Sequence, residues 1–203
     1  MNNMRFRHLS IIFPWHTLFG LFALLSILIP GQLLASDEAL VARMQEGGAV
    51  LMIRHAEAPG TGDPADFRLD DCRTQRNLSA EGRQQAKAIG DWLRVHGIQR
   101  ARVFSSQWCR CLETARLMDL GEVRPLQALN SFYQRPQDRE PNIAALRAFL
   151  TAQSSEPELL VLVTHQVTIS TLTGEYTSSG HGKLLELDGE GKFTFVGNVN
   201  FGQ

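Results

Sequence analysis

The chain has 203 residues and a formal net charge of −1, and 43% of its residues are hydrophobic while 20% are charged. This composition is typical of a globular protein and excludes a highly charged, disordered chain. The near-neutral charge gives no electrostatic basis for general nucleic-acid binding, so we expect no nucleic-acid partner. The sequence has no repeat of 20–50 residues, which excludes solenoids and propellers.

The first 35 residues differ from the rest in composition. They contain Arg5 and Arg7 but no acidic residue, then an apolar run over 18–29, and they end on Ala35. A positive start, an apolar stretch and a small residue at the end predict a secretory signal peptide over 1–35. The alternative is an uncleaved anchor, which is the one way in which we expect the chain to meet a membrane. Either way, we expect a periplasmic or secreted protein.

Residues 36–203 are long enough for a single domain with its own core. In chain order, the pattern of apolar and capping residues predicts a helix over 37–45, a strand over 49–53, a long loop over 58–77, a helix from 80 to about 96, a strand over 102–105, a helix over 107–120, an irregular segment over 122–139, a helix over 140–152, a strand over 159–163, a short helix over 167–172 and a hairpin of 183–187 with 192–196. Strands that alternate with helices predict an α/β fold, with a mostly parallel central sheet and helices on both faces.

Three cysteines, Cys72, Cys109 and Cys111, lie in this segment. An exported protein meets an oxidising environment, in which a disulfide can form and persist. Cys109 and Cys111 are too close in sequence to pair comfortably. We therefore predict a Cys72–Cys109 disulfide, with Cys72–Cys111 as the alternative and one thiol left free.

Polar residues follow three of the predicted strands. Arg54 and His55 come directly after the first strand, Arg110 lies in the first turn of the helix after the second, and His165 and Gln166 follow the third. The carboxyl ends of parallel strands meet at one edge of a sheet, and ligands bind there in open α/β sheets. The sequence therefore predicts that two histidines and two arginines meet in one site.

These side chains suit phosphoryl transfer. Guanidinium groups bind phosphoryl oxygens in a bidentate manner, and a neutral imidazole can attack phosphorus and hold the phosphoryl group covalently. Neighbouring positive charges keep the imidazole unprotonated near neutral pH. This set needs neither a metal ion nor an organic cofactor.

Four segments resemble the motifs of one family. Leu51-Met-Ile-Arg54-His55-Ala-Glu57 is similar to an Arg-His-Gly motif, and the segments over 78–86, 105–115 and 163–165 follow in the order and spacing of the histidine phosphatase superfamily, branch 1, also called the phosphoglycerate mutase-like family. The resemblance implies a three-layer sandwich in which His55 is the nucleophile. It also implies that Arg54, Arg110 and His165 complete the phosphate pocket, with Gln166 beside them.

The chain also departs from the family pattern. Gln166 stands where the acid phosphatase branch has Asp, which argues against that branch. Mutase members carry an acidic residue 20–30 positions after the second arginine, but residues 126–133 contain none. Four other carboxylates remain open as the general acid: Asp63, Asp66, Asp138 and Glu140.

The function that these features predict is an exported, metal-independent phosphomonoesterase with a phosphohistidine intermediate. Its partner would be a phosphorylated small molecule, and an envelope sugar phosphate is one candidate. The alternatives are a phosphohistidine or phosphoprotein phosphatase and a non-catalytic envelope phosphate-binding protein on the same fold. A mutase is disfavoured because its metabolite is cytosolic. We expect the loop over 58–77 to cover the site, where Arg68, Arg73 and Arg76 can hold a second anionic group.

Overall fold

The computed structural model describes residues 36–153, 156–188 and 192–202. The predicted signal peptide over 1–35 lies outside these residues, as does the turn at 189–191. None of the described helices has both the length and the apolar character that are needed to cross a membrane.

A six-stranded sheet forms the centre of the described chain, in the order β3-β2-β4-β1-β5-β6. The strands are β1 (Ala49–Arg54), β2 (Arg102–Ser105), β3 (Val123–Pro125), β4 (Leu160–Thr164), β5 (Gly182–Leu187) and β6 (Phe193–Val199). The first four are parallel to one another, whereas β5 pairs antiparallel with both β1 and β6. The sheet is therefore mostly parallel, as predicted.

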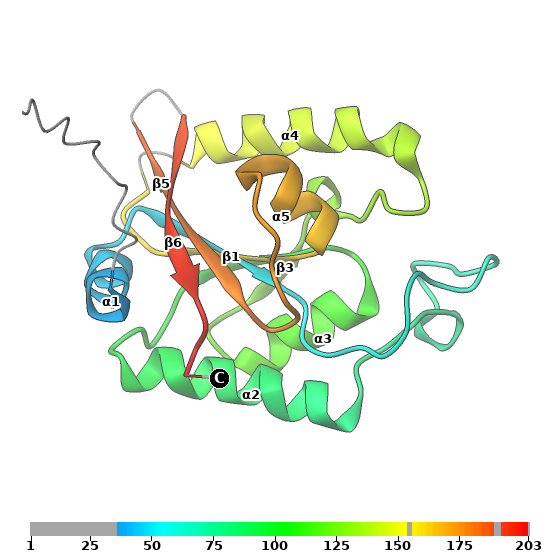
Figure 1. Cartoon of the computed structure of the whole chain (residues 1–203), viewed down its shortest axis with the longest axis horizontal. Coiled ribbons are helices and arrows are strands. Elements are labelled where there is room, and N and C mark those ends of the chain that lie inside the picture. Colours follow the sequence, from blue (N-terminus) through cyan, green and yellow to red (C-terminus); the bar gives the residue numbers. More distant parts are fainter. Residues whose placement is uncertain (1–35, 154–155, 189–191, 203) are drawn as a thin grey trace, which may run out of the picture. The chain divides into compact units, whose positions relative to one another are not determined.

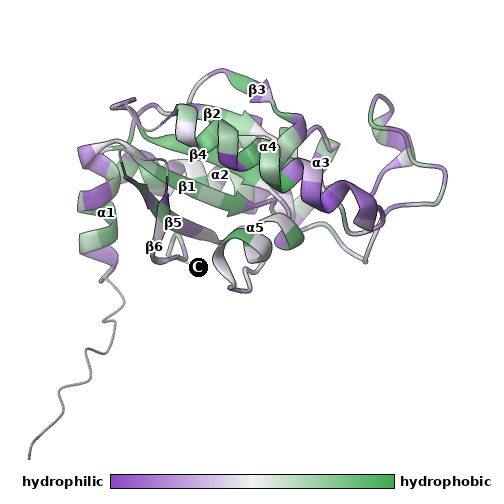
Figure 2. Ribbon diagram, turned by 90° about the horizontal axis from the view of Figure 1, so that it is seen from above, coloured by the Kyte–Doolittle hydropathy of each residue, from purple (hydrophilic) through white to green (hydrophobic). Residues whose placement is uncertain are grey.

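Helices cover both faces of this sheet (Figure 1), which confirms the α/β sandwich. The helices are α1 (Asp37–Glu46), α2 (Ala80–Val95), α3 (Cys109–Met118), α4 (Arg139–Ala152) and α5 (Gln166–Thr173). Leu51 and Ile53 of β1 pack with α1, α2 and α3, while Val50 and Met52 pack with α4 and α5. Since successive residues of a strand point to opposite faces, both faces of β1 are buried and its residues 49–53 are all apolar; Figure 2 shows this part of the strand as hydrophobic.

Local sequence explains where the first helices begin. The Ser36 hydroxyl accepts a hydrogen bond from the backbone of Ala39 at the start of α1, and Ser79 does the same for Gly82 at the start of α2. Glycine is required within α2, because a Cβ atom on Gly90 would lie 2.0 Å from the carbonyl oxygen of Met118. The absence of this side chain lets α2 pack closely on α3.

Strand register brings the ends of β1, β4 and β2 to the same level. Arg54 pairs with Thr164, and Ser105 pairs with Val163. The residues that follow these strands therefore leave the sheet side by side.

The structure differs from the predicted elements in one strand that was not predicted and in the bounds of one helix and one strand. The segment over 122–139, predicted to be irregular, contains β3, a three-residue edge strand that ends on Pro125 and has no apolar run to reveal it. Helix α3 begins at Cys109 rather than at residue 107, because the Gln107 side chain and backbone bind Asn130 instead. Strand β6 continues to Val199 rather than to residue 196.

The loop over 58–77 has few regular elements apart from a 3-10 turn at Cys72–Thr74. A disulfide joins Cys72 to Cys109, which confirms the predicted pairing, and Cys111 is free and buried. The disulfide fixes the far end of the loop to the first residue of α3. The Gln75 side chain adds to this attachment, because it accepts from the Cys109 backbone at 3.0 Å and donates to the Arg68 carbonyl at 2.7 Å.

Candidate active site

His55 lies at the point where β1 leaves the sheet, and it is only 2% exposed. Its backbone N–H donates to the Thr164 carbonyl at 3.0 Å, which continues the pairing with β4. Its Nδ1 lies 2.8 Å from the Ala56 carbonyl oxygen. A carbonyl can only accept, so Nδ1 carries the proton and Nε2 keeps its lone pair. The local backbone thus prepares Nε2 as the nucleophilic atom.

Arg54 precedes His55 and reaches across to the segment after α5. Its Nη1 donates to the Thr177 carbonyl at 3.0 Å and to the Tyr176 hydroxyl at 3.2 Å. These bonds use one end of the guanidinium and orient the group along the cavity wall. No described residue accepts a hydrogen bond from Arg54 Nη2, so this nitrogen is available to a ligand.

His165 and Arg110 lie beside His55 and are also buried. The His55 and His165 rings pack edge to face with their centroids 5.5 Å apart. Arg110 Nη2 lies 3.5 Å from His165 Nδ1. The structure therefore brings together the two histidines and two arginines that the strand ends predict.

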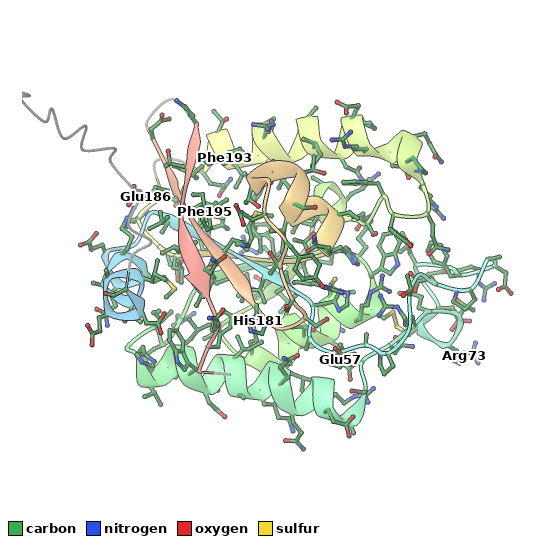
Figure 3. The ribbon with its side chains drawn as sticks, viewed as in Figure 1. Glu57, Arg73, His181, Glu186, Phe193 and Phe195 are labelled. Atoms are coloured by element: carbon green, nitrogen blue, oxygen red, sulfur yellow. A yellow bond between two sulfur atoms is a disulfide. The ribbon has the colours of Figure 1, made fainter. Side chains whose placement is uncertain are left out.

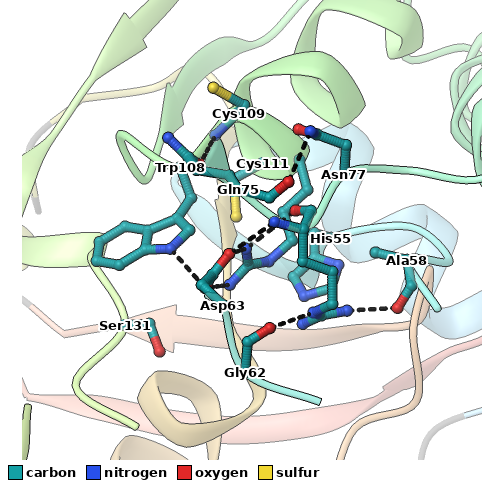
Figure 4. Close-up of polar contacts among 12 residues, drawn as sticks. His55, Ala58, Gly62, Asp63, Gln75, Asn77, Trp108, Cys109, Cys111 and Ser131 are labelled. Atoms are coloured by element: carbon teal, nitrogen blue, oxygen red, sulfur yellow. Dashed lines mark hydrogen bonds and ion pairs between the residues drawn. The ribbon is translucent and has the colours of Figure 1, made fainter. Parts of the chain in front are cut away.

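Asp63 forms a buried ion pair with Arg110. Its carboxylate accepts from Arg110 Nη1 at 2.8 Å and Nη2 at 3.2 Å, and both side chains are 3% exposed. The Trp108 indole N–H and the Arg76 backbone N–H also donate to it, each at 3.0 Å (Figure 4). The Gln134 side chain binds both the backbone N–H and the carbonyl of Asp63. The Asp63 carboxylate thus accepts the hydrogen bonds of the guanidinium that was predicted to bind phosphate.

Arg76 is the one arginine of the loop that lines the cavity. It donates to the carbonyl oxygens of Gly62, at 2.9 Å, and Ala58. The expectation for its neighbours is wrong, because Arg68 and Arg73 both pair with Asp71 and are exposed. Figure 3 shows Arg73 at the outer edge of the loop, pointing away from the sheet. These two arginines are not placed to bind a second anionic group.

The walls enclose a cavity of about 190 Å³. Its lining residues are Arg54, His55, Gly60, Thr61, Gly62, Asp63, Arg76, Arg110, Ser131, Tyr133, Gln134, His165, Gln166 and Val167. Of the four carboxylates left open as the general acid, Asp63 lines the cavity, whereas Asp66, Asp138 and Glu140 do not. The three guanidinium groups and the single carboxylate give this lining a net charge of +2 when both histidines are neutral.

Burial and charge set the protonation states of these groups. Desolvation lowers the pKa of His55 and of His165 well below 6.5, and the positive charge of Arg110 lowers both further. Burial alone would raise the pKa of Asp63, but the hydrogen bonds and charge of Arg110 outweigh burial and lower it below 3.8. Both imidazoles are therefore neutral and Asp63 is ionised at neutral pH.

Sequence reasoning missed how several residues act. Asn130 lies in the stretch where mutases carry an acid, yet it is buried and its amide binds Ser106 and Gln107. Trp108 is buried, and its indole N–H donates to Asp63. No local pattern marks an asparagine or an indole for such a task. Within the described ranges, no three His, Cys, Asp or Glu side chains converge as metal ligands.

Comparison with known proteins gives a family match and a shared fold. A family model for the histidine phosphatase superfamily (branch 1) matches residues 50–133, which include Arg54, His55 and Arg110. Over this segment the chain matches the superfamily. The protein is a phosphatase.

Several solved structures share the fold. The protein histidine phosphatase SixA complexed with tungstate is 19% identical, with a TM-score of 0.55 over 75% of this chain and 97% of that chain. The alpha-ribazole phosphatase from Shigella flexneri is 15% identical, with a TM-score of 0.57 over 75% and 96% of the two chains. A phosphoserine phosphatase variant from Entamoeba histolytica, in complex with phosphoserine, is 13% identical, with a TM-score of 0.53 over 75% and 97%. No curated protein gives a significant match to the chain.

Proposed function

We propose that the chain is an exported phosphomonoesterase that forms a phosphohistidine on His55 without a metal ion. The observation that carries this proposal is the charge of the cavity. Arg54, Arg76 and Arg110 surround two neutral imidazoles, and Asp63 is the single carboxylate of the lining. The resulting charge of +2 balances a phosphomonoester, which carries close to −2 at neutral pH. Two relatives bind ligands of this kind, tungstate in SixA and phosphoserine in the Entamoeba enzyme.

In the proposed reaction, the lone pair of His55 Nε2 attacks phosphorus while the ester P–O bond breaks. The arginines stabilise the charge on the phosphoryl oxygens, which is the main requirement of phosphoryl transfer. The leaving oxygen takes a proton, and water then hydrolyses the P–N bond, which releases phosphate and restores neutral His55. The Ala56 carbonyl accepts the hydrogen bond from Nδ1–H throughout, so Nε2 is the nucleophilic nitrogen in each cycle.

We assign Asp63 as the proton donor to the leaving group. In the empty site its ion pair with Arg110 keeps it ionised. A phosphoryl group that binds Arg110 takes over this partner and adds negative charge nearby, and both changes raise the pKa of Asp63. The carboxylate can then take up a proton, from solvent or from a substrate that arrives as a monoanion, and give it to the leaving oxygen.

For the substrate, we propose a small phosphorylated molecule, with an envelope sugar phosphate as the first candidate. The lining beyond the arginines supports this choice, because Thr61, Ser131, Tyr133, Gln134 and Gln166 are uncharged. Hydroxyl and amide groups can hydrogen-bond sugar hydroxyls. A second phosphate or a carboxylate on the substrate would meet no further cation in this lining.

The first test is turnover with and without His55. The purified protein should hydrolyse p-nitrophenyl phosphate in the presence of a chelator, and a base quench should trap phosphate on the peptide that contains His55. His55→Ala should abolish the label and reduce turnover by about 10⁴-fold or more. Phosphate binding without turnover would instead indicate a binding protein. Full chelator-resistant activity in His55→Ala would exclude the covalent mechanism on this residue, and dependence on a divalent ion would exclude the metal-free reaction.

Substrate class and export need separate measurements. Rates on sugar phosphates, phosphoserine and a phosphohistidine peptide should favour the sugar phosphates, and preference for the peptide would support the alternative phosphatase. Mass spectrometry of the protein from an intact host should give a chain that begins near Ser36, with residues 36–203 as one domain. The disulfide supports export, because such bonds persist mainly in oxidising compartments. A full-length cytoplasmic product would contradict export.

A further inference from the structure

The two ring nitrogens of His165 face different partners. Ser106 Oγ lies 2.9 Å from Nε2, and Arg110 Nη2 lies 3.5 Å from Nδ1. A guanidinium has N–H donors and no acceptor, so Nδ1 must present its lone pair to Arg110. A neutral ring then carries its proton on Nε2, provided that Ser106 accepts it.

Asn130 decides which way the Ser106 hydroxyl points. Its Oδ1 accepts from the Gln107 backbone N–H at 2.9 Å, and its Nδ2 donates to Gln107 Oε1 at 2.8 Å. These two bonds fix the orientation of the Asn130 amide, with its oxygen toward Ser106. Ser106 Oγ lies 3.2 Å from this oxygen and donates to it. Because its single proton is used, Ser106 Oγ is an acceptor toward His165 Nε2.

We propose that Ser106 and Asn130 are positioning residues that hold His165 as the neutral Nε2–H tautomer, so that His165 takes up a proton at Nδ1 when a phosphoryl group binds. This inference rests on the proposed function, because it concerns how the same cavity receives its substrate. In the empty site Nδ1 has no proton to give to a phosphoryl oxygen. To donate from Nδ1 while Nε2–H stays on Ser106, the ring must become an imidazolium.

The surroundings of His165 favour this change on ligand binding. The charged and titratable groups around its ring are Arg54, Arg76, Arg110, His55, Asp63 and Cys111. The arginines disfavour a cationic ring in the empty site, and a dianion among them cancels that effect. The added proton comes from the buffer, or from the substrate if it arrives as a monoanion. Cys111 stays a thiol, since burial raises its pKa to about 12.

Site-resolved ¹⁵N NMR of the histidine rings tests the inference directly. A His165→Gln sample identifies the signals of this ring by their loss. At pH 7 the empty wild-type protein should show Nε2 protonated and Nδ1 bare. Addition of sulfate, a tetrahedral dianion that does not titrate near this pH, should protonate both nitrogens. The tautomer is read from the wild-type protein, and the His165→Gln sample serves only to assign its signals.

Two serine variants separate positioning from general packing. Ser106→Ala removes the acceptor for Nε2–H, so the ring should lose its single-tautomer signature and kcat/KM should fall by about 10- to 100-fold, as when partners that orient other functional histidines are removed. Ser105→Ala is the matched control. Ser105 is equally buried, but its hydroxyl donates to the Ser106 carbonyl and does not touch His165. It should keep both the tautomer and the rate.

The outcomes that overturn the inference are specific. They are an Nδ1–H tautomer in the empty protein, a ring that stays neutral when sulfate is bound, or equal effects of the Ser105 and Ser106 variants. Failure of the proposed function is a different result, because the tautomer is measured without turnover. A protein with the Nε2–H ring and no hydrolysis of p-nitrophenyl phosphate would leave the positioning network intact and remove the phosphatase mechanism.

Discussion

The sheet wall of the cavity, formed by Arg54, His55 and His165, is held by backbone pairing, whereas the loop wall over 60–63 and 76 is held by side-chain contacts and one disulfide. His55 and His165 follow adjacent strands whose register is set along their whole length. Asp63 and Arg76 lie in a segment that is tied down at Gln134, at Gln75 and at Cys109. Because individual side chains and one disulfide hold this segment, single substitutions can loosen it without unfolding the sheet.

This difference suggests a division of tasks between the two walls. The group that attacks phosphorus needs a fixed position, because small displacements from the reacting geometry are costly. The groups of the loop wall must exchange partners, since Asp63 has to give up Arg110 before a phosphoryl group can use it. Each prediction below disturbs one wall and leaves the other in place.

Among the changes that separate the two walls, Asp63→Asn should have the largest effect. The amide cannot protonate a leaving alkoxide, so hydrolysis of alkyl phosphates should fall by about 10²–10⁴-fold. Hydrolysis of p-nitrophenyl phosphate should fall far less, because p-nitrophenolate leaves without a proton. Sulfate should bind more tightly, since the amide competes less for Arg110. Steady-state rates on both substrates and a sulfate titration measure these effects.

Asp66→Asn is the matched control for this variant. Asp66 belongs to the same loop, but it is exposed and does not line the cavity. Its replacement should leave both rates unchanged. An equal loss on alkyl and aryl phosphates in Asp63→Asn would show that Asp63 orients Arg110 and is not the acid.

Removal of the disulfide should weaken the loop wall. The bond closes a segment of 37 residues, so a Cys72→Ala, Cys109→Ala double variant should lose about 4 kcal/mol of unfolding free energy in the chain-entropy model. KM should rise more than kcat falls, because the sheet wall and His55 stay in place. Urea unfolding and steady-state kinetics measure the two effects.

Thiol titration checks the premise of that variant. The unfolded wild-type protein should react at one cysteine, Cys111. Three reactive thiols in protein from an oxidising compartment, or an unchanged unfolding free energy in the double variant, would contradict the role given to the bond.

The sequence predicted the sheet wall because backbone regularity leaves a pattern. Buried strands give apolar runs, and polar residues directly after such runs must share one edge of a parallel sheet, which locates Arg54, His55 and His165. Ser36 and Ser79 mark helix starts for an equally local reason. Strand β3 was not predicted because it has only three residues at the edge of the sheet. Only one of them is half-buried, so the strand leaves no apolar pattern.

The loop wall could be predicted only in part. The Cys72–Cys109 bond followed from the small number of cysteines, and the loop was expected to cover the site. Its arginines looked equivalent in sequence, yet Asp71 neutralises Arg68 and Arg73 while Arg76 turns inward. The inward position of Arg76 depends on the carbonyl oxygens of Gly62 and Ala58, to which it donates in the folded loop. A Gly- and Pro-rich segment has no periodicity from which such contacts can be predicted.

The smallest effect, an acid-dependent loss of stability, should come from the sheet wall. His55 and His165 have folded-state pKa values well below 6.5, whereas in the unfolded chain both titrate near 6.5. As the pH falls below about 6.5, the two histidines bind protons in the unfolded state but stay neutral in the folded state. The unfolding free energy should therefore be level above about pH 7 and fall below 6.5, by up to about 1.4 kcal/mol per pH unit for each histidine.

Urea unfolding between pH 5 and 7.5 measures this slope, and Asp63 does not contribute because its lowered pKa lies outside that range. His55→Asn should remove about half of the slope, since one buried imidazole remains. A slope that is unchanged in this variant would mean that acid acts on other groups.

Since acid charges the two histidines and a reductant opens the Cys72–Cys109 bond, each treatment weakens a different wall. Acid should therefore lower the stability of the disulfide-free variant with the same slope as in the wild-type protein, because the two losses add when they arise in separate parts of the structure.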